Sequence, residues 1–332
     1  MTKVLFLLGI DDSNLVRVRH VGPTGPVYDL QGSVDVSGDL RNPQLKKKVI
    51  VLGGTHPQPV KSPKPDVIFN CITDADCSAQ ALKLAMQVIQ QHKVPVINRP
   101  VHILKNRRDD VAATLAGIPG VVMPATQRLR PNSRQDILDA LAKGPVGYPA
   151  ILRRTGTHGG DTMVVLNSPA DAPLLDQVAC DGAEYFLISF IDFKDDDGLY
   201  RKTRLVVIGN RVFARHQLAS THWNVHANVR KGLMLERPAL AAAEEEFLKT
   251  FGKATFPFYA ERLATIQKRL KLEYFSIDCS LRPNGDLLIF EANPSGNALR
   301  QGNLEQFPYL RRPVQQMRTA LTELLLQIPA AK

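Results

Sequence analysis

Three oxygen-bearing side chains near the end of the chain, Asp278, Glu291 and Asn293, are of the types that bind Mg²⁺. They lie in YFSIDCSLRPNGDLLIFEANPSGN, residues 274–297, where two largely apolar runs flank Asn284-Gly285. Asn-Gly between such runs is the strongest short-range signal for a β-hairpin. A two-residue turn places Asp278 directly opposite Glu291, with Asn293 on the same face because side chains alternate along a strand.

The same register predicts the rest of the hairpin. Asn293 would face Ser276, Leu281 would face Leu288, and Cys279 would face Phe290. A turn with an odd number of residues would break this pairing. One face would then carry the acids, and the other would be apolar, consisting of Phe275, Ile277, Cys279, Leu281, Leu288 and Phe290.

Two carboxylates directly opposite on a sheet repel each other, with Cβ atoms about 5 Å apart. Such a pair needs a compensating cation or a shifted pKa. Mg²⁺ prefers hard oxygen ligands and usually completes its shell with phosphate oxygens and water. Asp278 and Glu291 therefore predict a Mg-nucleotide site, and the competing interpretation is a solvated hairpin face where two acids happen to meet.

A glycine-rich segment, YPAILRRTGTHGGDTMVV at residues 148–165, precedes this hairpin by about 120 residues. A strand, a glycine loop and a second strand form a flap that can lay backbone N–H groups over phosphates. Arg153 or Arg154, at the end of the first strand, would add positive charge. The sequence has no Walker A motif and no GxGxxG opening a helix, which disfavours a P-loop NTPase and a dinucleotide-binding domain.

The elements that must position these residues follow an α/β pattern. Short apolar runs end at Gly9, Leu52 and Asn70, and residues 78–91 carry the apolar period of a helix before another strand at 94–97. This order predicts a parallel, Rossmann-like sheet. Further helices are expected at 109–116, 240–270 and 314–326, the second with a break near Pro257. Two more helices are expected to begin at a capping box at Ser133 and after Ser168-Pro169. Further strands are expected at 150–153, 162–166, 185–191, 204–208 and 211–217.

Composition limits the class of protein. The chain has 332 residues, of which 44% are hydrophobic, enough for two or three domains, and no apolar run reaches the length of a membrane helix. Four cysteines without a CxxC motif predict a reducing cytoplasm, where Cys71 and Cys279 would be buried and inert. The net charge of +10 is spread out and lacks an aromatic platform, which favours an anionic small molecule over nucleic acid.

The glycine loop and the acidic hairpin, in this order, resemble the ATP-grasp superfamily, most closely the branch of the ribosomal-protein glutamate ligases and glutathione synthetases. The resemblance covers most of the chain. It implies an N-terminal Rossmann-like domain at 1–100, a central α+β subdomain with the glycine loop at 101–187, and a C-terminal α+β subdomain with the metal hairpin at 188–332, the last two clasping ATP.

The resemblance also implies roles for individual residues. Asp278, Glu291 and Asn293 would hold Mg²⁺, with two ions expected and Mn²⁺ as a substitute. Arg108 and Arg153 would contact phosphates, although the family usually has Lys at the second position. Arg204, Lys202 and Asn293 are the expected catalytic residues, and the first two would face the acyl-phosphate. The remaining ATP contacts expected are Gly156, Thr157, His158, Gly159, Gly160, Phe190, Ile191 and Asp192.

Phe186 to Asp192 resembles the interdomain hinge whose backbone recognises adenine. The usual hinge Glu is absent, because Ser189 or Phe190 stands there, and Asp192 is the expected ribose contact. In the loop after the metal ligands, Ser295 and Asn297 are expected to face substrate. Their competing role is a simple turn.

The implied activity is an ATP-dependent ligase that joins a small-molecule carboxylate to an amine, such as an amino acid or short peptide, through an acyl-phosphate. Two alternatives stay open: a kinase-like phosphoryl transferase, and a non-catalytic nucleotide-binding regulator. A homodimer is the default expectation for such an enzyme. The positive net charge hints at an acidic substrate.

Several polar residues have competing interpretations. The spacing of His222 and His226 suits zinc, but no third ligand is evident. A role for these two, Trp223 and His216 in a substrate pocket is the alternative, as is packing of Trp223. Asp74 and Asp76 could contact substrate or cap the helix that follows them.

Overall fold

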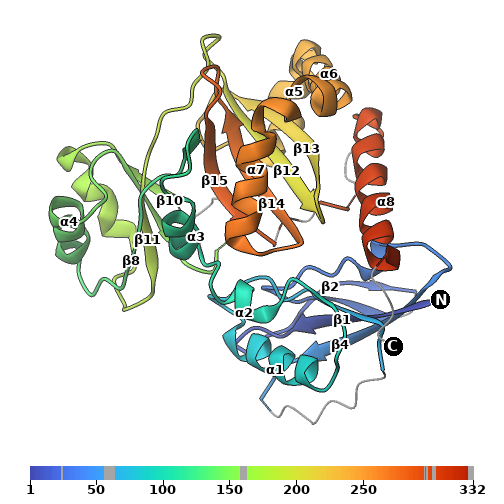
Figure 1. Ribbon diagram of the computed structural model, residues 1–332. Helices are drawn as coiled ribbons and strands as arrows, with labels where there is room; N and C mark the ends of the chain where they lie inside the picture. The colour runs from blue at the N-terminus through green and yellow to red at the C-terminus, as the bar shows by residue number, and fades with distance from the viewer. Residues whose placement is uncertain are drawn as a thin grey trace.

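The computed structural model describes residues 1–23, 25–55, 64–157, 163–294, 296, 298–300 and 304–327. Its chain forms three larger sheets, and the central and C-terminal sheets lie next to each other above the N-terminal sheet in the view of Figure 1. Within the described residues, no helix combines the length and the apolar character that crossing a bilayer requires.

The N-terminal sheet is parallel, as the sequence predicts, with the strand order β4-β1-β5-β6. Helix α1 packs on one face through Ala81, Leu82 and Ala85, in a core shared with Leu5 and Leu7 of β1. The bounds are β1 (Thr2–Gly9), β4 (Leu45–Leu52), β5 (Val67–Asn70), α1 (Ala79–Gln90), β6 (Val96–Ile97) and α2 (Pro100–Ile103). Asp11 and Thr73, which follow the carboxyl ends of β1 and β5, line the large cavity of the molecule.

A two-stranded hairpin follows β1 and is absent from the elements that the sequence predicted. It consists of β2 (Arg17–Gly22) and β3 (Gly25–Asp29), which pair in antiparallel fashion with a register shift between Val18 and His20. Most of its side chains are exposed. The sequence did not predict this hairpin, because its Val, Arg and His residues do not form the apolar face that marks a half-buried strand.

The central sheet has the strand order β10-β9-β11-β8 and contains the predicted glycine-loop strands. Met163 pairs with Arg153 across β9 and β10. Helix α4 begins with the predicted capping box between Ser133 and Asp136, and it covers the sheet with Ile137 and Leu141. The bounds are β8 (Thr126–Leu129), α4 (Arg134–Lys143), β9 (Ala150–Arg154), β10 (Met163–Leu166), the 3-10 helix η2 (Pro169–Gln177) and β11 (Tyr185–Ser189).

The C-terminal sheet has the strand order β13-β12-β14-β15-β7, and the metal hairpin supplies its β14 and β15. Helix α7 packs Leu263 and Ile266 against Phe275 and Ile277. The break expected near Pro257 separates α6 from α7. The bounds are β7 (Val121–Val122), β12 (Tyr200–Ile208), β13 (Arg211–Ser220), α5 (Leu233–Glu236), α6 (Pro238–Ala254), α7 (Phe256–Leu270), β14 (Tyr274–Leu281) and β15 (Leu287–Asn293).

Two helices join the sheets into one body. Helix α3 (Arg108–Leu115) leads into β7, which pairs in parallel with β15 of the C-terminal sheet. Helix α8 (Arg311–Gln327) packs Met317 and Leu321 in a core shared with Val4 of β1 and Val206 of β12. The domain boundaries near residues 100 and 187 stay predictions. Three short 3-10 helices complete the structure: η1 (Ser37–Asp39), η3 (Ala227–Arg230) and η4 (Pro308–Leu310).

Candidate active site

The central feature of the acidic hairpin is confirmed: Asp278 pairs with Glu291, and Ser276 pairs with Asn293. The turn itself differs from the prediction. Gly285 N–H donates to Arg282 O at 2.9 Å, and Arg282 N–H donates to Asp286 O at 3.0 Å, so the loop holds three residues. Pro283 explains this length, because its fixed φ suits the first corner of a type I turn, and Gly285 then adopts φ +84°.

A bulge restores the register that this odd loop length would break. Cys279 pairs with Ile289 and Leu281 with Leu287, and the register shifts between Asp278 and Cys279, which leaves Phe290 as the extra residue. The predicted pairs Leu281–Leu288 and Cys279–Phe290 are therefore wrong.

The bulge also changes which residues of β15 lie on the apolar face of the hairpin. Leu287 and Ile289 pack in the core with Phe275 and Ile277. Leu288 and Phe290 instead belong to a second cluster with Phe193 and Tyr200, and both line a large cavity. Sequence alternation missed these two cavity residues because the loop length moved the strand by one position.

The cavity has a volume of about 910 Å³, near the upper end for small-molecule sites, and it lies among the three sheets. It contains most of the residues singled out from the sequence. Those lining it are Arg108, Arg153, Gly156, Thr157, Phe190, Ile191, Lys202, Arg204, Asp278, Glu291 and Asn293. His158, Gly159, Gly160, Ser295 and Asn297 lie outside the described residues.

The two carboxylates of the hairpin are each paired with cations from other elements. Arg204 of β12 donates to both oxygens of Asp278, from Nε at 2.6 Å and from NH2 at 2.8 Å, and Lys202 Nζ lies 3.7 Å from the same carboxylate. Arg108, at the start of α3, lies 3.0 Å from Glu291. Asp278 is only 7% exposed and the side chain of Glu291 is 31% exposed, and the burial of Asp278 disfavours the interpretation as a solvated face.

Asn293 completes the polar group by donating its amide N–H to Glu291 Oε1. The carboxamide oxygen of Asn293 and the oxygens of Asp278 and Glu291 thus form a cluster of hard donors on one face of two paired strands. This donor set fits Mg²⁺, which takes one or two carboxylates from the protein and its other ligands from phosphate or water. Each carboxylate can exchange its arginine partner for a metal ion without losing charge compensation.

Part of the cavity lining is apolar and suits an aromatic base. Ile151 and Met163 from the glycine-loop strands, Ile188 from β11, and Leu288 and Phe290 from β15 contribute to it. At the hinge, Phe190 N–H donates to Pro149 O at 2.9 Å, and the Phe190 ring meets Trp223 edge-on with centroids 5.5 Å apart. Trp223 therefore combines packing with a place in the cavity wall.

The residue expected to bind ribose lies elsewhere. Asp192 is exposed and outside the lining of the cavity, and its carboxylate accepts from Lys194 N–H at 3.3 Å. Arg282 donates to the backbone oxygen of Asp192 at 3.0 Å. The assignment of Asp192 stays a prediction that this placement does not favour.

The histidines divide into two groups. His226 lines the cavity, whereas His216 and His222 do not. The Nδ1 atoms of His222 and His226 accept from the backbone N–H groups of Asn224 and Asn228, at 3.2 and 3.4 Å. No group of three metal-ligating His, Cys, Asp or Glu side chains occurs within the described residues, which leaves the zinc interpretation without support.

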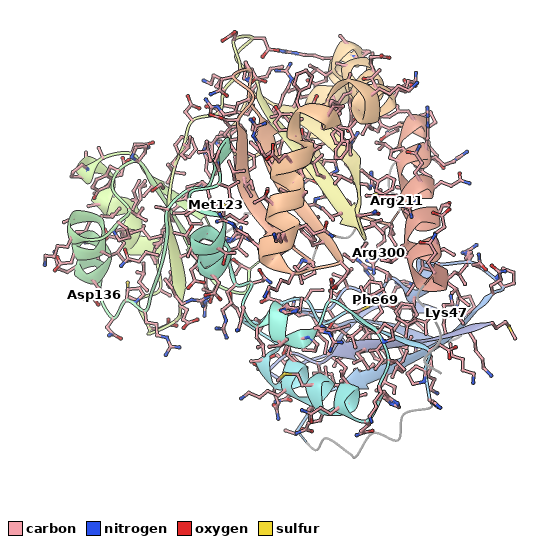
Figure 2. All side chains as sticks on the ribbon, viewed as in Figure 1. Lys47, Phe69, Met123, Asp136, Arg211 and Arg300 are labelled. Carbon is pink, nitrogen blue, oxygen red and sulfur yellow. The ribbon has the colours of Figure 1, made fainter. Side chains whose placement is uncertain are left out.

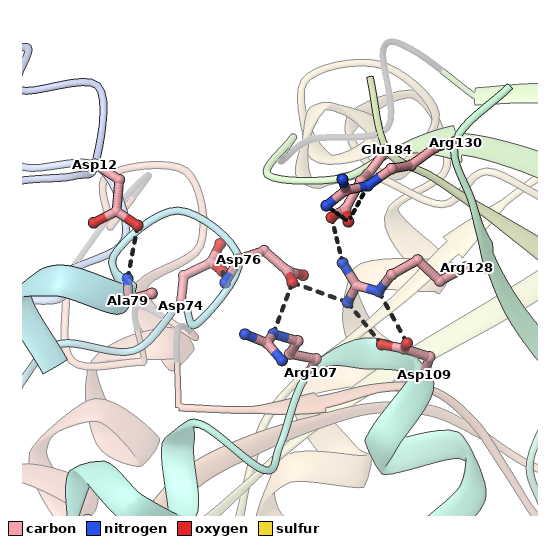
Figure 3. A network of polar contacts seen from close by, with 9 residues as sticks. All are labelled: Asp12, Asp74, Asp76, Ala79, Arg107, Asp109, Arg128, Arg130 and Glu184. Atoms are coloured by element: carbon pink, nitrogen blue, oxygen red, sulfur yellow. Dashed lines mark hydrogen bonds and ion pairs between the residues drawn. The ribbon is translucent and has the colours of Figure 1, made fainter. Parts of the chain in front are cut away.

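A charged network holds the central sheet against the N-terminal sheet (Figure 3). Arg128 of β8 binds Asp109 at 2.7 and 2.9 Å, Glu184 at 2.7 Å and Asp76 at 2.9 Å. Asp76 also pairs with Arg107 at 3.2 Å. Asp76 therefore links the N-terminal part of the chain to β8 of the central sheet. It does not cap α1, because the N–H groups of Ala79 and Gln80 donate to Asp12 at 3.0 Å.

We expect Arg128→Met to lower the free energy of unfolding by about 2 kcal/mol at pH 7, because three acids lose a shared, partly buried partner. Burial opposes ionisation of Asp109, but the hydrogen bonds and charge of Arg128 outweigh it and hold the pKa of Asp109 below its ordinary value of 3.8. A lowered pKa stabilises the fold above pH 3.8, and that stabilisation disappears as the pH falls through the lowered pKa.

Urea denaturation of both proteins at several pH values tests this prediction. The difference between wild type and Arg128→Met should be largest near pH 7 and shrink below pH 3.8. Arg134→Met is the control, since Arg134 and Asp176 form an exposed pair that should change stability by less than about 0.5 kcal/mol. Equal effects of the two substitutions would contradict a structural role for the network.

The loop after β15 forms another wall of the cavity. A Cβ on Gly296 would lie 2.0 Å from Ser276 Oγ, so only glycine lets this loop approach β14 so closely. Sequence analysis also missed the loop after β1, where Asp11 and Ser13 line the cavity. The available signal was their place at the carboxyl end of a parallel strand, where ligands of open α/β sheets bind.

Comparisons with known proteins identify the fold. No family model and no curated protein sequence matches the chain. Among solved structures, the VanG D-Ala:D-Ser ligase of Enterococcus faecalis superposes with a TM-score of 0.55 at 12% identity, covering 98% of this chain and 99% of the ligase. The D-alanine–D-alanine ligase of Bacillus anthracis, in a complex with ATP, gives 0.54 at 11% identity, covering 99% and 97%.

A RimK-domain ATP-grasp protein of Sphaerobacter thermophilus gives a TM-score of 0.52 at 14% identity, covering 97% of this chain and 99% of that one. Together these similarities span nearly the whole chain and define it as an ATP-grasp fold. They do not separate the glutamate-ligase branch, expected from the sequence, from the D-alanine ligases.

Proposed function

We propose that the chain is an ATP-dependent carboxylate–amine ligase that forms an amide or peptide bond through an acyl-phosphate and releases ADP and phosphate. One observation carries the proposal: Asp278 lies opposite Glu291 in a cavity that four basic side chains also line, those of Arg108, Arg153, Lys202 and Arg204. The ATP-grasp fold and the ligase names of its structural neighbours support the same conclusion.

ATP would bind along the cavity from the hinge to the hairpin. Its adenine would lie between the glycine-loop strands and Leu288 and Phe290, and its phosphates would point towards Arg108 and Arg153. Asp278, Glu291 and Asn293 would hold one or two Mg²⁺ ions, with Mn²⁺ as a substitute. When bound, the metal would neutralise negative charge on the phosphates.

The reaction requires positioning and charge neutralisation more than acid–base chemistry. A carboxylate oxygen of the acid attacks the γ-phosphorus, the bond from that phosphorus to the β-γ bridging oxygen breaks, and ADP leaves. The amine nitrogen then attacks the acyl carbon, the C–O bond breaks, phosphate leaves, and the nitrogen releases a proton. Arg204 and Lys202 would stabilise the charge on the transferring phosphoryl group, because both line the cavity beside Asp278.

The glycine loop would exclude water from the acyl-phosphate. Its described end already meets the N-terminal part of the chain, since Gln31 Nε2 donates to Gly156 O at 3.2 Å. Arg153 donates to Thr157 O within the loop and so holds the loop's first turn.

We expect Arg153→Gln to weaken Mg-ATP binding about tenfold, because the phosphates lose a charge-assisted hydrogen bond worth about 1.5 kcal/mol. Arg153 is half-buried, and burial together with the nearby Arg108 lowers the pKa of its guanidinium, so an anionic ligand would be a favourable partner. Isothermal titration calorimetry with Mg-ATP checks the change.

The control is Arg130→Gln, because the side chain of Arg130 is 71% exposed and lies outside the lining of both pockets near the hairpin. Its affinity for Mg-ATP should stay within about twofold of wild type. If the two variants bound equally well, Arg153 would not be a phosphate contact.

The proposal is tested by incubating the protein with Mg-ATP and pools of amino acids and short peptides, and recording ADP, AMP, phosphate and new masses. ADP and phosphate that form only when acid and amine are both present support the ligase. AMP and pyrophosphate would contradict the acyl-phosphate route. ADP release that needs no amine would favour a kinase-like transfer instead.

A further inference from the structure

The part of the cavity nearest the N-terminal sheet is lined by arginines that the ATP site does not use. Arg17 and Arg19 come from β2, and Arg300 comes from the loop after β15. Figure 2 shows Arg300 between the N-terminal and C-terminal sheets. Within the described residues, none of these three guanidinium groups takes part in an ion pair.

The β2–β3 hairpin is shaped to present two arginines together. Arg17 faces Asp29 across the hairpin, Val18 pairs with Tyr28, and His20 pairs with Val27, so Arg19 is the extra residue of a bulge. A bulge redirects the side chain of its extra residue, and such bulges are common beside active sites. Both Arg17 and Arg19 line the cavity.

The backbone near Arg300 is held by hydrogen bonds from two other arginine side chains. Arg215 is itself the extra residue of a bulge in β13, and it is only 9% exposed. It donates from Nε to Ala298 O at 2.8 Å and from NH2 to Arg300 O at 3.0 Å. Arg318 of α8 donates to Leu299 O at 2.9 Å. Two arginines therefore hold this loop so that a third faces the cavity.

The acids of this region do not cancel the three arginines. Asp29 and Asp11 also line the cavity, but Asp11 accepts hydrogen bonds from the N–H and Oγ of Ser13. Around the whole cavity, the described residues include seven Lys and Arg against four Asp and Glu. Asp278 and Glu291 are paired with cations near the phosphates, so the excess at the N-terminal end is available for another anion.

We propose that Arg17, Arg19 and Arg300 bind a second anionic group, a carboxylate or a phosphate, on the acid substrate. This inference rests on the proposed ligase function, which supplies the first carboxylate, the one that reacts. A planar guanidinium binds carboxylate or phosphate through two parallel hydrogen bonds, so the three arginines select for charge as well as position. The substrate is then an acid with two anionic groups rather than a simple monocarboxylic acid.

The experiment uses matched pairs of acids that differ in the second anionic group: L-glutamate and L-glutamine, L-aspartate and L-asparagine, and O-phospho-L-serine and L-serine. ADP release is measured with each acid, Mg-ATP and a pool of amino acids as amines. We expect kcat/KM to be at least about tenfold higher for the charged member of one pair. This ratio corresponds to the free energy of one charge-assisted hydrogen bond. The carboxylate pairs and the phosphate pair show which anion fits.

Arg17→Gln, Arg19→Gln and Arg300→Gln should each reduce this preference about tenfold, mainly through KM, while Mg-ATP affinity stays within about twofold of wild type. His20→Gln is the control, because His20 lies on the same strand but outside the cavity lining. Thermal unfolding of each variant, with and without the charged acids plus Mg-ADP, separates misfolding from lost binding.

Equal use of charged and neutral acids by the wild type, or an unchanged preference in all three variants, would overturn the proposal. So would a wild type that binds Mg-ATP yet neither turns over nor is thermally stabilised by any charged acid. Failure to bind Mg-ATP, or formation of AMP, would instead refute the ligase function.

Discussion

Replacing Glu291 by glutamine is expected to lower ATP turnover by about 10³-fold with little change in folding. Glutamine keeps the size of the side chain and removes the negative charge that faces Asp278 across the hairpin. The metal would lose one of two carboxylate ligands, and Arg108, 3.0 Å from Glu291, would lose its charged partner. Steady-state ADP release and the free energy of unfolding are the two measurements.

Asp286→Asn is the matched control for this prediction. Asp286 is a carboxylate of the same hairpin, but it lies at the turn, where it accepts from Asn284 at 2.8 Å, outside the cavity lining. Its turnover should stay within about twofold of wild type. Turnover by Glu291→Gln at the control's rate would show that the acidic hairpin is not the metal site.

Arg204→Met should have the second-largest effect, and it should act on both stability and catalysis. Arg204 holds Asp278 through two hydrogen bonds at 2.6 and 2.8 Å, and Asp278 is 7% exposed. Without Arg204 a nearly buried carboxylate loses its main partner, which should cost about 3 kcal/mol of unfolding free energy. In the proposed mechanism Arg204 is a cation beside the γ-phosphate, so its loss should also lower kcat by about 10²-fold.

Adding Mg-ATP separates the effect of Arg204→Met on stability from its effect on catalysis. The metal would supply a new partner for Asp278, so Mg-ATP should stabilise Arg204→Met more than it stabilises the wild type, as measured by thermal unfolding. Arg201→Met is the control, because Arg201 lies on the same strand, pairs with Asp195 and Asp197, and is absent from the cavity lining. A fully active Arg204→Met would remove Arg204 from the proposed mechanism.

The acidic hairpin shows what the sequence could predict and where it failed. The predicted pairing of Asp278 with Glu291 is correct, although the two-residue turn assumed for it is wrong. Pro283 lengthens the loop to three residues, and the bulge at Phe290 shifts the register back by one. Local turn chemistry cannot reveal a bulge, because the bulge depends on how Leu288 and Phe290 pack against Phe193 and Tyr200 of other segments.

Residues with one strong local signal were predicted well, whereas those selected by tertiary packing were missed. The parallel N-terminal sheet and the capping box of α4 follow from apolar periods and from Ser133 with Asp136. Cys71 and Cys279 are buried as expected, and burial raises the pKa of both thiols. Arg17, Arg19 and Arg300 gave no signal, because only the folded chain brings them to one cavity.

The proposed acyl-phosphate is tested most directly by following oxygen from the acid to phosphate. The acids of the substrate pool are labelled with ¹⁸O in their carboxylates and incubated with the protein, Mg-ATP and amines, and the phosphate released is analysed by mass spectrometry. Attack of a carboxylate on the γ-phosphorus predicts one ¹⁸O atom in each phosphate formed. Label recovered in AMP, or phosphate that carries no label although amide product forms, would contradict it.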